Sequence, residues 1–331
     1  MDLSQLLNDV NDFVWGPIML AFLVGTGVFL TIRLKFLPWI NLIYAIKMIM
    51  LHKADNKGDL SPFQSLMTAL SATVGTGNIV GVATAMVLGG PGAIIWMWIS
   101  AAFGLSTKYA ESVLAVKYRE TNSVGEMAGG PMYAMKNGIG GGFGKIMATL
   151  FAIFAVCASF GIGNMTQANS ISSAFESSFG WSGEVTGIIL VICSLLVLMR
   201  GVHSIGKVSS FIVPSMAFFY ILFTVIIIIV NFENVPGGLA IMFKMAFSTE
   251  AVAGGVGGSI VASMLTAMRW GVARGVFSNE AGLGSAPIAA AAARTDHASR
   301  QGYVNMTGTF LDTMIICFLT GLVIAISGVL G

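Results

Sequence analysis

The feature that most constrains this chain is a series of apolar runs, each about 20 residues long, that recurs from one end to the other. Hydrophobic residues make up 56% of the sequence and charged residues only 10%, whereas soluble domains carry roughly 25% charged residues. A helix of that length crosses the hydrocarbon core of a bilayer. The sequence therefore predicts an all-α, polytopic membrane protein whose solvent is mostly lipid.

The apolar runs and the charged segments between them define eight candidate spans. The first follows an acidic N-terminus, where a secretory signal would be basic, so we expect it to be a membrane helix and not a cleaved signal peptide. The predicted spans are residues 13–33, 62–88, 91–117, 143–171, 184–200, 207–231, 255–293 and 303–330.

The distribution of lysine and arginine favours one orientation of these spans. Arg33, Lys35 and Lys47 follow the first span, whereas Asp9 precedes it. Because loops rich in Lys and Arg stay on the cytoplasmic side, the N-terminus is predicted to lie outside. The later loops agree, since the two short loops expected outside contain neither residue type.

Residues 251–293 form a stretch long enough for two spans. Two crossings would place Arg294 and Arg300 outside, so we expect one crossing that is preceded by an outer re-entrant or interfacial stretch. Arg269 and Arg274 then lie in the outer half of a span, where they must face a wet cavity or a partner.

Two spans carry glycines and polar residues at their centres. Residues 71–92 read SATVGTGNIVGVATAMVLGGPG, and residues 274–293 read RGVFSNEAGLGSAPIAAAAA. Such positions either allow close helix packing or mark an unwound helix whose backbone groups line a site. Because the two spans lie five spans apart and run in opposite directions, we favour broken helices at corresponding positions of two inverted halves.

A broken helix brings its own chemistry. The amides at the start of a half-helix attract an anion, and the carbonyls at the end of a half-helix attract a cation. A zwitterionic amino acid accompanied by Na+ needs both. By contrast, no nucleophile and base, metal triad or organic-cofactor motif stands at usable spacing, and no basic stripe predicts nucleic-acid binding, so the sequence does not predict an enzyme.

Five long motifs carry a family resemblance. They are LMTALSATVGTGNIVGVATA, GGPGAIIWMWISAAFG, GEMAGGPMY, SFGIGNMTQANS and RGVFSNEAGLGSAPIAAAAA. In this order they resemble the alanine or glycine:cation symporter family, the sodium:alanine symporters. The resemblance implies a LeuT-type fold in a single transmembrane domain over residues 1–331, with an extra N-terminal span at 13–33, a first inverted repeat at 62–231 and a partial second repeat at 255–331. That fold has ten core helices, of which about seven are expected here.

The same resemblance implies a function. It implies a symporter in the plasma (inner) membrane that takes up small neutral amino acids, alanine or glycine, by alternating access, with Na+ as the coupling ion and no organic cofactor. A proton-coupled carrier is one alternative. A non-transporting or truncated protein that senses an amino acid is another.

The resemblance also places a site at the centre of the first broken span. The amides of this segment would hold the substrate carboxylate, a carbonyl would face its amine, and carbonyls of the preceding turn would give part of a sodium site. The implied substrate residues are Thr73, Gly75, Thr76 and Gly77. The implied sodium ligands are Ser71, Val74 and, as the weaker candidate, the side chain of Asn78.

Further site candidates come from two other spans. Phe160, Asn164 and Gln167 are spaced to share one helix face, which would either close the pocket or form interhelical hydrogen bonds. The matching candidates in the second broken span are Phe277, Ser278, Asn279 and Gly282.

Four charged residues within spans need partners. Glu280, at the centre of the second broken span, should have a partner or a cation. Asp312, in the last span, has either a coupling role or a place in a buried pair. Lys108 and Glu111, three residues apart, are predicted to form a structural pair.

Overall fold

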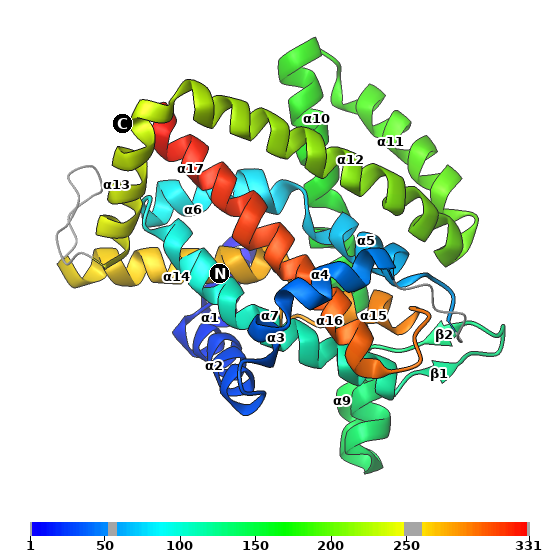
Figure 1. Cartoon of the computed structure of the whole chain (residues 1–331). Coiled ribbons are helices and arrows are strands. Elements are labelled where there is room, and N and C mark those ends of the chain that lie inside the picture. The colour runs from blue at the N-terminus through cyan, green and yellow to red at the C-terminus, as the bar shows by residue number, and fades with distance from the viewer. Residues whose placement is uncertain (1, 52–57, 248–259, 330–331) are drawn as a thin grey trace.

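The computed structural model describes residues 2–51, 58–247 and 260–329, and helices dominate all three ranges (Figure 1). The helices before the first predicted break are α1 (Leu3–Val14), α2 (Pro17–Arg33), α3 (Leu37–Ile40) and α4 (Leu42–Leu51). The next elements are α5 (Pro62–Thr73), the π-helical turn η1 (Gly77–Gly81), α6 (Val82–Gly89) and α7 (Ala93–Lys117).

The middle of the chain contains one short hairpin and a group of long helices. The hairpin strands β1 (Glu120–Thr121) and β2 (Met127–Ala128) pair antiparallel. The helices that follow are α8 (Pro131–Ala134), η2 (Met135–Ile139), α9 (Gly141–Phe160), η3 (Gly161–Met165), α10 (Thr166–Phe179), α11 (Gly183–Leu198) and α12 (Gly201–Val230).

The last third of the chain contains several helices that pack against α5 and α7. Its elements are η4 (Phe232–Asn234), α13 (Val235–Phe247), α14 (Ile260–Asn279), α15 (Ala286–Ala291), α16 (Ala298–Thr309), η5 (Phe310–Cys317) and α17 (Phe318–Ser327). The stretch from α16 to α17, orange to red in Figure 1, runs as one long helix past α5 and α7.

Within the described residues, five of the eight predicted spans are long and apolar enough to cross a membrane. Four are continuous helices, and the fifth is a bent pair formed by Pro62–Thr73 and Gly77–Gly89. The other three predicted spans correspond to the helices α7, α11 and α14. The all-α, multi-pass architecture predicted from the apolar runs is therefore confirmed.

Several described helices lie outside the predicted spans. The longest of them are α1, α4 and α13, with 12, 10 and 13 residues, each shorter than a membrane span. These helices were not predicted because only apolar runs of about 20 residues, long enough to cross a bilayer, were taken as helices. The outer stretch expected at residues 251–259 lies outside the described residues.

Two arginines of α14 have the partners that the sequence required. Arg269 forms an ion pair with Asp12 at 3.0 Å. Arg274 lies over the rings of Trp270 and Phe277, at 5.7 and 5.6 Å from their centroids. Of the two arrangements expected for these cations, a wet cavity or a partner, the structure shows a partner for each.

The hairpin region carries a surface ion pair. Lys136 contacts Glu120 at 3.0 Å, and both side chains are partly exposed. Hydrogen bonds from Asn137 and Lys136 lower the pKa of Glu120 because they stabilise its ionised form.

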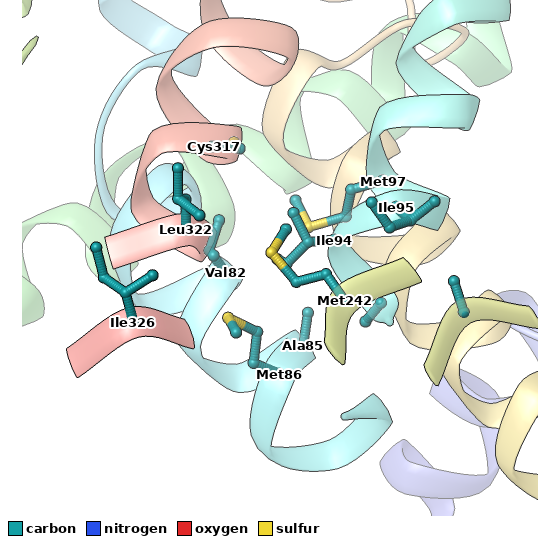
Figure 2. Close-up of a cluster of buried hydrophobic side chains, with 12 residues drawn as sticks. Val82, Ala85, Met86, Ile94, Ile95, Met97, Met242, Cys317, Leu322 and Ile326 are labelled. Atoms are coloured by element: carbon teal, nitrogen blue, oxygen red, sulfur yellow. The ribbon is translucent and has the colours of Figure 1, made fainter. Parts of the chain in front are cut away.

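The core gathers around α7, which packs against α2, α14 and α16. Part of this core is a buried apolar cluster, and Figure 2 shows its side chains pointing toward one another from α6, α7, α13, η5 and α17. The cluster includes Val82 and Met86 of α6, Ile94 and Met97 of α7, Met242 of α13, and Leu322 and Ile326 of α17.

Glycines allow α14 to lie close to α7. A Cβ atom added at Gly271 would stand 2.3 Å from the carbonyl oxygen of Ala93, and one at Gly275 would stand 2.5 Å from Oγ of Ser100. Close approach through small residues is the usual way in which helices associate inside a membrane. The contact fixes the position of α14 and of the break that follows it.

The substitution Gly271→Ala tests this contact. We expect it to destabilise the protein by about 1 to 3 kcal/mol, because the added methyl group overlaps a backbone oxygen that cannot move freely. Thermal unfolding in detergent measures the loss. Gly187→Ala in α11 is the matched control, since an added Cβ there meets nothing within 4 Å. Equal melting temperatures for the two variants would contradict the packing argument.

Candidate functional site

The predicted break in the first span is present. Helix α5 ends at Thr73, and the helix resumes at Gly77 with a bend of 53° between its two halves. The amide of Gly75 donates to Oδ1 of Asn78 at 2.7 Å, and not to the carbonyl of Ser71 as a regular helix would require. The break therefore releases the carbonyl of Ser71 from its helical hydrogen bond.

Gln167 of α10 reaches the break from a distant part of the chain. Its Oε1 atom accepts hydrogen bonds from the amide of Thr76 at 3.2 Å and from the Thr76 hydroxyl at 2.7 Å. A Cβ atom at Gly75 would lie only 2.9 Å from the same oxygen, so a larger residue there would displace the Gln167 side chain from this position. The freed amide of Thr76 thus already holds an acceptor oxygen, which is what a carboxylate would also offer.

The second predicted break is also present, between Asn279 and Ala286. Glu280, Gly282 and Gly284 all have positive φ angles, of 54°, 92° and 81°. Non-glycine residues rarely adopt this region, so Glu280 holds a constrained turn. Its carboxylate accepts a hydrogen bond from Ser285, which confirms that this charge has a partner.

Lys108 of α7 caps the end of α14. Its ammonium nitrogen donates to the carbonyl oxygen of Asn279 at 2.6 Å. The described residues include no ion pair between Lys108 and Glu111. The two side chains therefore form no direct ion pair, because the ammonium group bonds to a backbone carbonyl at the break, although their buried charges still attract each other.

Asp312 joins the two broken helices. It is fully buried within the π-helical segment η5. Its Oδ1 accepts from Nδ2 of Asn78 at 2.8 Å, and its Oδ2 accepts from the hydroxyl of Ser278 at 2.8 Å. Thr313 adds a further bond to Oδ2 at 2.7 Å. One carboxylate therefore contacts both breaks.

The partners of Asp312 are neutral. Within the described part of the chain, Asp312 forms no ion pair, and its hydrogen-bond donors are an amide and two hydroxyls. A carboxylate that is buried without a cation is costly in a medium of low dielectric. With the hydroxyls of Ser278 and Thr313, it offers oxygen atoms that suit a hard cation.

The two breaks also touch directly. A Cβ atom at Gly77 would lie 3.5 Å from Cα of Ser278 and 3.6 Å from the ring of Phe277, so both residues pack against the first break. The side chain of Asn279 donates to Thr313 at 3.1 Å and accepts from the amide of Ala281 at 2.9 Å. Asn279 therefore stabilises the second break internally.

Other predicted site residues lie away from this centre. Phe160 and Asn164 are exposed; Phe160 precedes the π-helical turn η3, Asn164 lies within it, and Gln167 follows it. Ser71 is exposed and its hydroxyl contacts Ser209 at 3.3 Å. Of the α9–α10 candidates, only Gln167 contacts the first break.

The sequence reading missed Thr313 and the role of Lys108 at the second break. A threonine beside a buried aspartate in an apolar span was the available signal for Thr313. For Lys108 the signal was a cation in the middle of a long helix, but its bond to the carbonyl of Asn279 was not predicted.

A backbone clasp closes the far end of the second broken span. Arg119 donates to the carbonyls of Ala291 and Ala293 at 2.8 and 2.7 Å. The amide of Leu60, just before α5, donates to the carbonyl of Ala292 at 3.0 Å, and Leu60 accepts from the amide of Arg294 at 2.7 Å. The clasp ties the segment that leads into the first broken span to the segment that leaves the second.

Comparison with known proteins gives a consistent result. The model of the sodium:alanine symporter family matches residues 1–331. The chain is 54% identical to the sodium/alanine symporter AgcS of Methanococcus maripaludis, over 99% of this chain and 72% of that protein. It is 39% identical to the probable sodium/glutamine symporter GlnT of Bacillus subtilis, over 98% of this chain and 66% of that protein.

Proposed function

The chain belongs to the sodium:alanine symporter family, and from this premise we propose that it carries small neutral amino acids, alanine or glycine, together with Na+. The family's members are transporters and not enzymes. The proposal places the protein in the plasma membrane with its N-terminus outside, in a LeuT-type fold that works by alternating access. The observation that supports it best is the meeting of two broken helices at Gly77.

The amino acid binds at the first break. Its carboxylate accepts hydrogen bonds from the amide and hydroxyl of Thr76 and replaces Oε1 of Gln167, the neutral acceptor of these bonds. A carboxylate oxygen forms a stronger, charge-assisted bond with the same donors. The amide of Gly77 is a second donor for the substrate carboxylate. The carbonyl of Thr73 faces the substrate amine.

The size of the substrate side chain follows from what packs against the break. Phe277 and Ser278 lie in van der Waals contact with the position where a Cβ of residue 77 would be. Little space is left on that side for a bulky side chain. This favours alanine and glycine, and the name of AgcS gives alanine; the name of GlnT, a probable sodium/glutamine symporter, gives a larger amide substrate for that relative.

The sodium ion binds beside the same break. The carbonyls of Ser71 and Val74 lie at its edge, and the carbonyl of Ser71 is released because Gly75 bonds to Asn78. Asp312 supplies the negative charge that compensates the cation, through its contacts with Asn78 and Ser278. Asn78 therefore contributes to the sodium site through two hydrogen bonds: it accepts from the amide of Gly75 and donates to Asp312.

Alternating access then consists of rocking of the broken helices around this centre. The clasp formed by Arg119, Leu60 and the segment after α15 closes the end that the loop charges place inside. Release of the substrate into the cell requires these hydrogen bonds to open. Binding of Na+ and the amino acid shifts the population only by its difference in affinity for the two states.

Uptake into vesicles tests the proposed function. The reconstituted protein is expected to accumulate labelled alanine under an inward Na+ gradient and to stop when that gradient alone is collapsed. Accumulation driven by a proton gradient without Na+ would assign proton coupling instead. Saturable alanine binding without accumulation would point to a sensor and contradict transport.

The substitution Gln167→Glu tests the position of the carboxylate. A second negative charge at the amide of Thr76 repels the substrate, so the alanine concentration for half-maximal uptake is expected to rise about tenfold or more. Asn169→Asp, two residues further along α10 and exposed, is the control with the same change of charge. Similar values for both variants would place the carboxylate elsewhere.

The substitution Asp312→Asn tests the contribution of the buried charge to sodium binding. The Na+ concentration for half-maximal uptake should rise about tenfold or more, because the neutral amide no longer compensates the ion. Asp296→Asn removes an exposed carboxylate that pairs with Arg300 and serves as the control. An unchanged sodium dependence in Asp312→Asn would separate this residue from the cation.

A further inference from the structure

We propose that Cys317, in the last span, limits how tightly the protein holds its coupling ion, because its sulfur lies among the groups that surround Asp312, where an oxygen would be a better ligand for Na+. The inference rests on the proposed function, since it concerns the sodium site of that function. Cys317 was not predicted as part of the site, so it adds a residue to it.

Cys317 contacts the same two side chains that hold Asp312. Its sulfur lies 3.2 Å from Nδ2 of Asn78 and 3.2 Å from Oγ of Ser278. Asn78 belongs to η1 at the first break, and Ser278 belongs to the last turn of α14 before the second break. The buried thiol, like the carboxylate, therefore contacts both broken helices.

The π-helical geometry of η5 brings Asp312 and Cys317 to one side of the span. The two residues are five positions apart, and a regular α-helix would turn them about 140° away from each other. A π-helix bonds residue i to residue i+5 and so places such a pair on the same face. Most π-helices are single-turn insertions, often at functional sites, whereas η5 extends over eight residues. The helix type therefore places the sulfur beside the carboxylate.

Acceptor atoms outnumber hydrogens where these side chains meet. Nδ2 of Asn78 carries two hydrogens. The acceptors within 3.2 Å of it are Oδ1 and the carbonyl oxygen of Asp312, Oγ of Ser278 and Sγ of Cys317. The hydroxyl of Ser278 gives its one hydrogen to Oδ2 of Asp312, so the thiol is the donor in the contact between Ser278 and Cys317. A buried group of acceptors with too few hydrogens attracts a cation.

The sulfur is the soft atom of this group. Hard cations prefer oxygen ligands, and a neutral thiol is a weak acceptor that packs as a small hydrophobic group. Cys317 also belongs to the buried apolar cluster, and Figure 2 shows it at the edge of that cluster. It thus closes the polar centre toward the apolar core without adding a strong ligand. An ion held by one ligand fewer dissociates more readily, as release into the cell requires.

The substitution Cys317→Ser tests this role through the stabilisation of the protein by Na+. Melting in detergent is measured at rising NaCl concentrations, with KCl added to keep the total salt constant. An ion that binds the folded protein raises its melting temperature. Because the hydroxyl adds an oxygen beside Asp312, C317S is expected to need about fivefold less NaCl than the unsubstituted protein for the same rise. An equal or higher requirement would overturn the proposal.

Two further variants separate the added oxygen from other effects. Cys317→Ala removes the sulfur and adds no oxygen, so its NaCl requirement is expected to stay within about twofold of that of the unsubstituted protein. A rise of tenfold or more in C317A would make the sulfur itself a ligand and would overturn the proposal, even if C317S does not fold.

Cys193→Ser is the matched control. It makes the same substitution at an exposed cysteine of α11 and is expected to leave the NaCl requirement unchanged. A decrease in C193S as large as that in C317S would show that the oxygen at position 317 is not the cause, and would overturn the proposal.

Uptake into vesicles measures the consequence for transport. C317S is expected to reach half-maximal alanine uptake at a lower Na+ concentration and to have a lower maximal rate per folded protein, because the ion leaves more slowly. A maximal rate equal to that of the unsubstituted protein would overturn the role in ion release.

The two readouts separate the inference from the function on which it rests. If the unsubstituted protein accumulates no alanine under a Na+ gradient, the proposed function fails. The melting comparison needs no transport and still decides the role of Cys317. A melting temperature of the unsubstituted protein that rises no more in NaCl than in KCl would overturn the inference.

Discussion

A broken helix inside a membrane must find a partner for every backbone amide and carbonyl that it releases, because lipid offers none. The arrangement of the core follows from this requirement. At the first break, the side chain of Asn78 accepts a hydrogen bond from the amide of Gly75, and that of Gln167 accepts one from the amide of Thr76. At the second break, Lys108 donates a hydrogen bond to the carbonyl of Asn279. The partners come from α7, α10 and the breaks themselves, so helices distant in sequence are held to the same centre.

The partners of the two breaks differ in kind. The first break is held by neutral carboxamides, whose bonds can be exchanged for bonds to a ligand at little net cost. The second is held by the ammonium group of Lys108, whose removal would leave the buried carbonyl of Asn279 without this partner. Asp312 lies between them and bonds to Asn78 and to Ser278, so the geometry of one break depends on that of the other.

The sequence allowed both breaks to be predicted, because glycines and polar residues interrupt apolar runs at Gly75 and after Asn279. It could not supply the partners, since contacts such as that between Asn78 and Asp312 join residues 234 positions apart. The expected common face of Phe160 and Gln167 assumed a regular helix, and the π-helical turn between them changes their angular relation. Short helices such as α4 were missed because only span-length runs were sought.

The strength of the partners also indicates which break can receive a ligand. Gln167 contacts the amide of Thr76 at 3.2 Å through a neutral oxygen on a half-buried side chain, and α10 around it is largely exposed. Lys108 contacts its carbonyl at 2.6 Å and is almost fully buried between α7 and α14. A substrate carboxylate can displace the first contact and gain a charge-assisted bond. To displace the second, a ligand would have to expel a charged side chain that has no water to enter. The first break is therefore the exchangeable one, and the second is the fixed support against which it is held.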